Sequence, residues 1–237
     1  MSDAVPPLLR ATLPPAPEPG SARYFALLYT PAERRPALAR LLALADEIGT
    51  GIARGLDHEV AHARLDWWRH EAGQYAVGRA QHPWLRSLPE QQPGRLQLDL
   101  HSLLEAAAVD LAEGRQRPYG GERLRRALFA AAAEVLGAGP LSPALRDAIS
   151  ALGALTWEFE RAPSAAPTAD AVLATAALQP VLDRLGAAQQ PKLAPLLVWA
   201  ALAARRAKNT SLLQGFADNI RAWSVARRAI ARTFTSR

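Results

Sequence analysis

The chain has 237 residues, of which 49% are hydrophobic, and a formal net charge of +6. This length suffices to bury a sizeable core, and we expect one large domain rather than two small ones. The absence of cysteine excludes disulfides, thiolate metal sites and cysteine nucleophiles. Alanine and leucine dominate while β-branched runs are scarce, which predicts an all-α fold.

Proline recurs through residues 1–21, which predicts a disordered or extended arm before a domain over residues 22–237. The N-terminus has no basic segment followed by an apolar core, and no run approaches the roughly 20 apolar residues that span a bilayer. We therefore expect a cytoplasmic protein, peripheral at the inner membrane if it contacts lipid.

Eight helices with short connections are expected, which favours a single-domain helical bundle. Thr30 is predicted to cap the first helix, with Pro31 at its first position, and Asp57 to cap the second, whose apolar stripe includes Val60. The expected helices cover residues 30 to 49 or 51, 57 to about 81, about 96 to 113, 122 to 136, 142 to 161, 168 to 185, about 193 to 208, and 211 to 232.

The last expected helix, 211–232, is basic and amphipathic. Trp223 falls near its apolar side and Arg228 on another, and residues 192–237 hold nine Lys and Arg residues against Asp218 alone. Such a helix either lies on an anionic membrane surface or closes the bundle with its apolar side. Nucleic acid is not an expected partner, because basic and aromatic residues do not alternate along any element.

The segment "HEVAH", residues 58–62, matches the H-E-x-x-H pattern of zinc metalloproteases. His58 and His62, one turn apart, can bind Zn²⁺, and Glu59 can act as a general base on the metal-bound water. The pattern occupies the first turn of a helix and lacks a recognisable third ligand downstream, although Asp66 or His70 could complete a surface site. We keep it as a remote alternative.

Other enzyme classes lack the residues that would carry their chemistry. The chain contains no G-x-S-x-G, no P-loop and no dinucleotide fingerprint. These absences argue against hydrolase, nucleotide triphosphatase and dinucleotide-binding functions.

The order of several segments resembles the squalene and phytoene synthase family. "RYFALLYTPAERRPALARLLALADEIGTG" resembles the family's opening, in which an aromatic segment precedes a helix with a D-x-x-x-D motif. "LDWWRHEAGQYAVGRAQHPWLRSL" is similar to the next block, and "ALGALTWEFERAP" falls where the family carries its second aspartate-rich motif. The resemblance covers roughly residues 22–210. It implies an all-α fold of the isoprenoid synthase type.

Members of this family join two prenyl diphosphates head to head, and the resemblance implies where the metal ligands would lie. Their carboxylates hold Mg²⁺ against the diphosphate. Asp46 matches the first position of the first motif, but Thr50 stands one turn on, which leaves Glu47 as the only other nearby acid. In the second motif region, Glu158 and Glu160 are two positions apart and so face different sides of a helix. Both motifs look degenerate.

Two functions follow from the resemblance. In the first, the chain has lost prenyltransferase catalysis, needs no cofactor, and acts as a binding or assembly factor near the membrane, as does a branch of the superfamily that assists complex I assembly. In the second, it remains an active Mg²⁺-dependent prenyltransferase that uses Asp46, Glu47 and a further acid such as Asp110 or Glu158. Prenyl diphosphate or a protein is the expected partner. Catalytic residues are not assigned.

Overall fold

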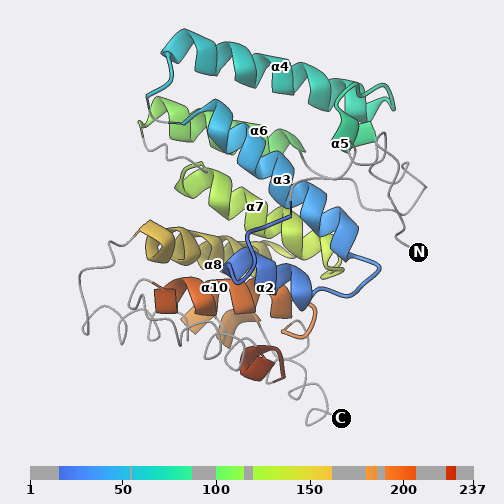
Figure 1. Cartoon of the computed structure of the whole chain (residues 1–237), viewed down its shortest axis with the longest axis vertical. Helices are drawn as coiled ribbons and strands as arrows, with labels where there is room; N and C mark the ends of the chain where they lie inside the picture. Colours follow the sequence, from blue (N-terminus) through green and yellow to red (C-terminus); the bar gives the residue numbers. More distant parts are fainter. Residues whose placement is uncertain are drawn as a thin grey trace, which may run out of the picture. The chain divides into compact units, whose positions relative to one another are not determined.

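The computed structural model describes eight ranges of the chain: 16–53, 55–86, 100–114, 120–161, 180–181, 183–185, 190–206 and 223–227. Within these ranges all regular secondary structure is helical, which confirms the all-α prediction. The helices, coloured along the sequence in Figure 1, are α2 Ala22–Leu28, α3 Arg35–Gly51, α4 His58–Ala76, α5 Pro83–Arg86, α6 Leu100–Ala112, α7 Glu122–Val135, α8 Pro143–Arg161 and α10 Ala194–Arg206.

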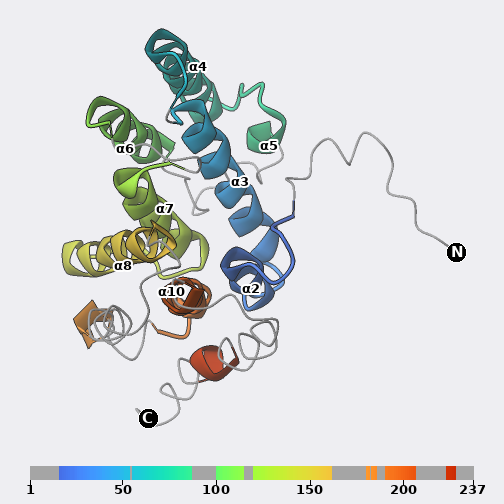
Figure 2. The same ribbon diagram turned by 60° about the vertical axis from the view of Figure 1, so that its left-hand side comes forward.

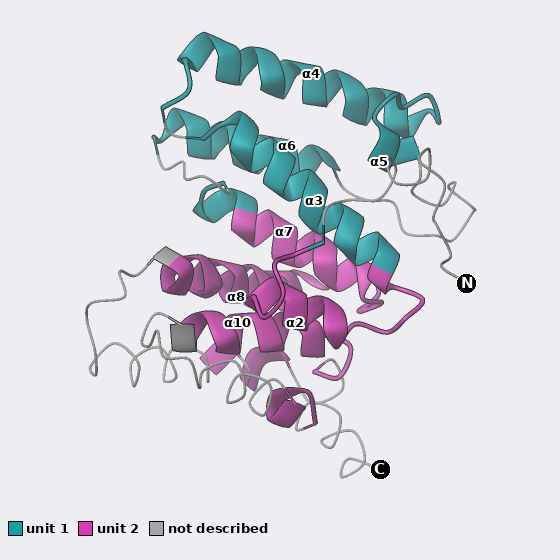
Figure 3. Cartoon of the chain, in the orientation of Figure 1, with its two compact units in different colours: residues 1–16, 36–124 teal, residues 17–35, 125–237 magenta. Residues whose placement is uncertain are grey.

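The chain divides into two compact units that are nested in the sequence rather than consecutive (Figure 3). Unit 1 contains residues 1–16 and 36–124, and unit 2 contains residues 17–35 and 125–237. The chain passes between units three times: after residue 16, near the start of α3, and within α7. The single domain expected over residues 22–237 stays a prediction.

In unit 1, α4 packs against α6 through a narrow face. The buried residues of α4 are Ala61, Leu65, Trp68 and Glu71. They recur at intervals of three and four, so they form one stripe, while the rest of the helix surface meets solvent. The facing helix α6 supplies leucine and alanine side chains, including Leu103 and Ala107, which are fully buried. Apolar burial on one stripe of each helix therefore holds this pair together.

In unit 2, α10 packs against both α2 and α8. Figure 2 shows α10 nearly end-on between them. Residues 193–200 of this segment are all buried, which is the pattern of a helix surrounded by neighbours rather than lying at a surface. Helix α8 comes close to α7 at Gly153, where an added Cβ atom would lie 2.8 Å from the Arg125 carbonyl oxygen.

Several predicted helix ends are confirmed. The Asp57 carboxylate accepts hydrogen bonds from the backbone N–H groups of Glu59 (2.8 Å) and Val60 (3.3 Å), so Asp57 caps α4 as expected. Helix α3 ends at Gly51, and α8 begins at Pro143. The helices expected over 168–185 and 211–232, and the arm over 1–21, lie largely outside the described residues.

Three local predictions were wrong. Thr30 caps no helix: its hydroxyl donates to the Ala26 carbonyl (2.8 Å), and α3 begins only at Arg35. Helix α4 ends at Ala76 instead of reaching His82, because Gly78 adopts a φ of 72° that closes the helix. Val60, placed in the buried stripe of α4, is exposed. None of the helices in the described ranges is long and apolar enough to cross a membrane.

Candidate functional site

The remnant of the first motif lies on α3 in unit 1. Asp46 is half-buried, and its backbone carbonyl accepts a hydrogen bond from the Thr50 hydroxyl (2.7 Å). Thr50 thus occupies the position of the second motif carboxylate and bonds back to its own helix. The Glu47 carboxylate lies 3.3 Å from Nε2 of His82, and its side chain is 44% exposed. Glu47 lies on α3 and His82 directly precedes α5, so the contact joins two separate elements of unit 1.

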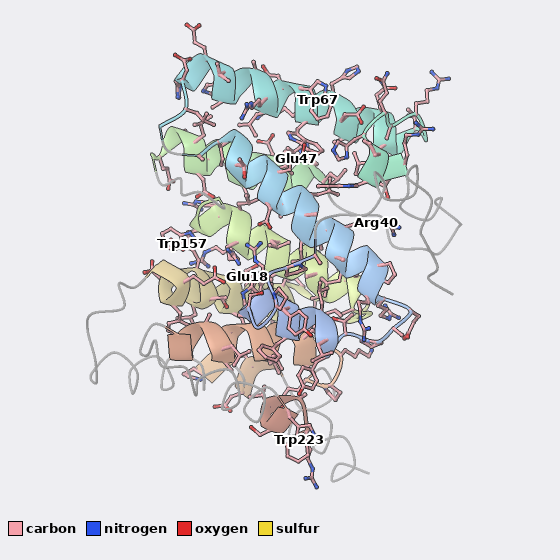
Figure 4. The ribbon with its side chains drawn as sticks, viewed as in Figure 1. Glu18, Arg40, Glu47, Trp67, Trp157 and Trp223 are labelled. Carbon is pink, nitrogen blue, oxygen red and sulfur yellow. The ribbon has the colours of Figure 1, made fainter. Side chains whose placement is uncertain are left out.

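His82 lies among three tryptophans, and with Glu47 they form what we call the His82 cluster (Figure 4 labels Glu47 and Trp67). The His82 ring centroid is 6.1 Å from Trp67, 5.0 Å from Trp68 and 5.2 Å from Trp84. Trp68 is buried, whereas Trp67 is 48% exposed. Edge-on and tilted packing of this kind adds to the free energy gained by burying the rings.

The backbone at His82 is held by a buried carboxylate. Glu71 on α4 accepts hydrogen bonds from the backbone N–H groups of Gln81 (3.0 and 3.1 Å) and His82 (2.8 Å). These part-buried donors precede α5, and Glu71 supplies the acceptor for both. Glu71 therefore fixes the chain that presents His82 to Glu47.

The two ring nitrogens of His82 have different surroundings. Nε2 of His82 faces Glu47, and Nδ1 is buried with no hydrogen-bond partner in the described part of the chain. The Glu47 side chain is 44% exposed and Trp67 is 48% exposed. Glu47 and Trp67 are therefore the members of the cluster that can meet a partner.

The second motif region lies on α8 in unit 2. Glu158 is exposed, and Glu160 accepts a hydrogen bond from the Trp199 indole N–H (2.8 Å) and pairs with Arg125 (2.8 Å). The two glutamates therefore face different surroundings, as their spacing predicts. Arg125 also stacks on the Trp199 ring at 4.9 Å. Glu160, at the solvent side, links buried Arg125 of α7 and buried Trp199 of α10 to α8.

Asp110, considered above as a spare metal ligand, is fully buried at the end of α6. Its carboxylate oxygens accept hydrogen bonds from the backbone N–H groups of Arg123 (3.1 Å) and Leu124 (2.8 Å). Burial raises the pKa of the Asp110 carboxyl above its ordinary value, and these two hydrogen bonds act in the opposite direction. Gly121 is required beside it, because a Cβ atom there would overlap the carboxylate. Asp110 thus caps α7 from a neighbouring helix.

The two histidines of "HEVAH" lie on the first turns of α4, with their Nε2 atoms 3.0 Å apart. Asp66, a possible third ligand, instead pairs with Arg69 (2.9 Å). Within the described ranges, no group of three or more His, Cys, Asp or Glu side chains could hold a metal ion. The structure thus brings His58 and His62 together but supplies no third protein ligand there.

No protein-family model, curated protein or solved structure matches the chain. Sequence reasoning missed the roles of Glu71 and His82, which depend on contacts between different helices that helical periodicity does not encode.

Proposed function

We propose that the chain is a non-catalytic relative of the squalene and phytoene synthases that acts by binding, as an assembly or docking factor near a membrane. One observation carries the proposal: an acidic side chain in each motif region, and the further acid Asp110, are engaged by the chain's own donors. Glu47 pairs with His82, Asp110 caps α7, and Glu160 binds Arg125 and Trp199.

These contacts matter because prenyl transfer depends on Mg²⁺ ions held by carboxylate oxygens. Asp110 is fully buried against two backbone N–H groups, so a metal ion could reach its carboxylate only if this packing opened and these hydrogen bonds were disturbed. Leaving a buried donor without an acceptor costs about 1–3 kcal/mol each. Asp46 and Glu158 remain the candidates for a catalytic role, although neither is without a partner.

Product analysis tests the loss of catalysis. The full chain is incubated with Mg²⁺ and farnesyl or geranylgeranyl diphosphate, and hydrocarbons are identified by mass spectrometry. The proposal predicts no C30 or C40 product. Formation of a coupled product, lost in Asp46→Asn and kept in the exposed control Asp147→Asn, would establish the alternative, an active Mg²⁺-dependent prenyltransferase.

Membrane contact is the second part of the proposal. Trp223 is 52% exposed in the described segment 223–227, and Arg227 stacks on its ring at 4.9 Å (Figure 4 labels Trp223). Amphipathic helices at lipid surfaces combine tryptophan with basic residues. We expect the chain to float with phosphatidylglycerol vesicles and not with phosphatidylcholine vesicles, and Trp223→Ala to weaken flotation. Equal recovery with both vesicle types would contradict membrane binding.

A further inference from the structure

His58 and His62 bring two imidazole groups together on α4. Their Nε2 atoms share a hydrogen bond of 3.0 Å, and their rings meet edge to face with centroids 4.4 Å apart. Both side chains are exposed on α4, so solvent and ions can reach them. Neither residue takes part in the function proposed above.

The fold holds the two rings on one face. Asp57 fixes the start of α4 by accepting hydrogen bonds from two backbone N–H groups. Ala61 and Leu65 are buried and anchor the opposite side of the same turns. Residues four apart on a helix lie one above the other, so both imidazoles project from the same strip of surface.

We propose that His58 and His62 form a two-histidine chelate for a late first-row divalent ion, with Cu²⁺ and Ni²⁺ preferred. The two Nε2 atoms already approach to hydrogen-bond distance, 3.0 Å, so both rings reach one point where a metal ion would replace the shared proton. Imidazole nitrogen suits late first-row ions, whose affinity rises toward Cu²⁺ along the series. Square-planar or tetragonal Cu²⁺ and Ni²⁺ accept two nitrogens in adjacent positions.

The surroundings define what kind of site this is. The N-terminal end of a helix carries a partial positive charge that opposes a cation, and the carboxylates of Asp57 and Glu59 counter it. The described residues supply no third protein ligand, so water or a ligand from solution completes the coordination. The site is therefore a surface chelate with open positions, distinct from a closed structural zinc site.

The rest of the chain offers little competition for such an ion. There is no cysteine, and the chain has five histidines in all. His82 is enclosed by tryptophans and Glu47, while His70 and His101 are exposed on different helices. His70 lies on the same helix as the pair, which makes it the matched control.

Calorimetric titration tests the proposal on the full chain, purified without a histidine tag. We expect wild type and His70→Ala to bind one Ni²⁺ with similar affinity, and His62→Ala to lose at least about tenfold, since even the loss of an outer partner of a ligand has that effect. Circular dichroism serves as the control that His62→Ala remains helical. The expected order of affinity is Cu²⁺, then Ni²⁺, then Zn²⁺.

Electron paramagnetic resonance gives a second readout. The Cu²⁺ spectrum of wild type should show coupling to two imidazole nitrogens, reduced to one in His62→Ala. The chelate is refuted if wild type shows no saturable binding at millimolar Ni²⁺, or if His62→Ala binds Ni²⁺ as tightly as wild type. Neither result bears on prenyl transfer, so the two proposals stand or fall separately.

Discussion

Asp110 lies on α6 but caps the start of α7, so replacing it with alanine removes a buried cap from a neighbouring helix. The side chain is fully buried and accepts hydrogen bonds from the backbone N–H groups of Arg123 and Leu124 at the start of α7. Water has no access to replace the lost acceptor at Leu124. The variant therefore tests whether this acid serves the fold, as we infer, or a catalytic site.

The expected cost follows from the two donors. A buried N–H group left without an acceptor costs about 1–3 kcal/mol, and the Arg123 donor is only partly buried, so Asp110→Ala should lose about 2–4 kcal/mol. For a chain of this size, such a loss lowers Tm by about 5–12 °C. Asp110→Asn keeps one acceptor oxygen but turns its NH2 group toward the other N–H donor, so it should lose at least about half as much stability as Asp110→Ala.

Thermal unfolding followed by circular dichroism measures both variants beside Asp147→Ala, which alters an exposed aspartate on α8. The control should unfold within about 2 °C of wild type. If Asp110→Ala unfolds at the wild-type temperature, the carboxylate does not hold α7, and Asp110 returns to the list of metal-ligand candidates.

Three further predictions concern stability. Burial raises the pKa of Asp110 above 3.8, so the stability that the protonated group contributes is fully present below pH 3.8 and is lost as pH rises through the folded pKa. The difference in unfolding free energy between wild type and Asp110→Asn should therefore be larger at about pH 4 than at about pH 7. Urea unfolding at the two pH values measures it. Gly153→Ala should lose about 1–3 kcal/mol in thermal unfolding, since its Cβ would press on α7. Glu71→Ala should lose about 2–3 kcal/mol and shift tryptophan emission, since it frees two backbone donors beside the His82 cluster.

Two variants control for the last two predictions. A Cβ atom at Gly73 on α4 would meet nothing within 4 Å. Gly73→Ala should therefore raise the free energy of unfolding by about 0.5–1 kcal/mol, because alanine favours the helix. Glu105→Ala breaks only an exposed ion pair with Arg69 and should change stability by less than about 1 kcal/mol. Equal effects at Gly153 and Gly73 would refute the close helix crossing. Equal effects at Glu71 and Glu105 would refute the buried cap.

The features predicted correctly from the sequence depend on neighbours along the chain. Asp57 caps α4 through donors two and three residues away, and Pro143 begins α8 where a fixed φ suits a first turn. The prediction that Thr30 caps the following helix was wrong because a threonine hydroxyl can either cap a following helix or donate to a carbonyl of the preceding one. Here α2 supplies the Ala26 carbonyl four residues earlier, so the second option is realised.

The site was harder to predict, because its contacts join separate helices. Glu47 appeared in the sequence as part of a degenerate metal motif, and nothing in the sequence marked His82 as its partner. Asp110 and Glu71 gave no local sign that they would cap α7 and the segment before α5. A carboxylate's role depends on which donors the fold brings to it, and a single sequence does not contain that pairing.

The measurement that tests the central claim most directly is calorimetric titration of farnesyl diphosphate into the full chain with and without Mg²⁺. If the fold has taken over the acids, Mg²⁺ should add no saturable binding, since a Mg²⁺–diphosphate complex needs several carboxylate oxygens at once. Saturable binding that requires Mg²⁺ and disappears in both Asp46→Asn and Glu158→Gln would contradict the account and identify a working diphosphate site.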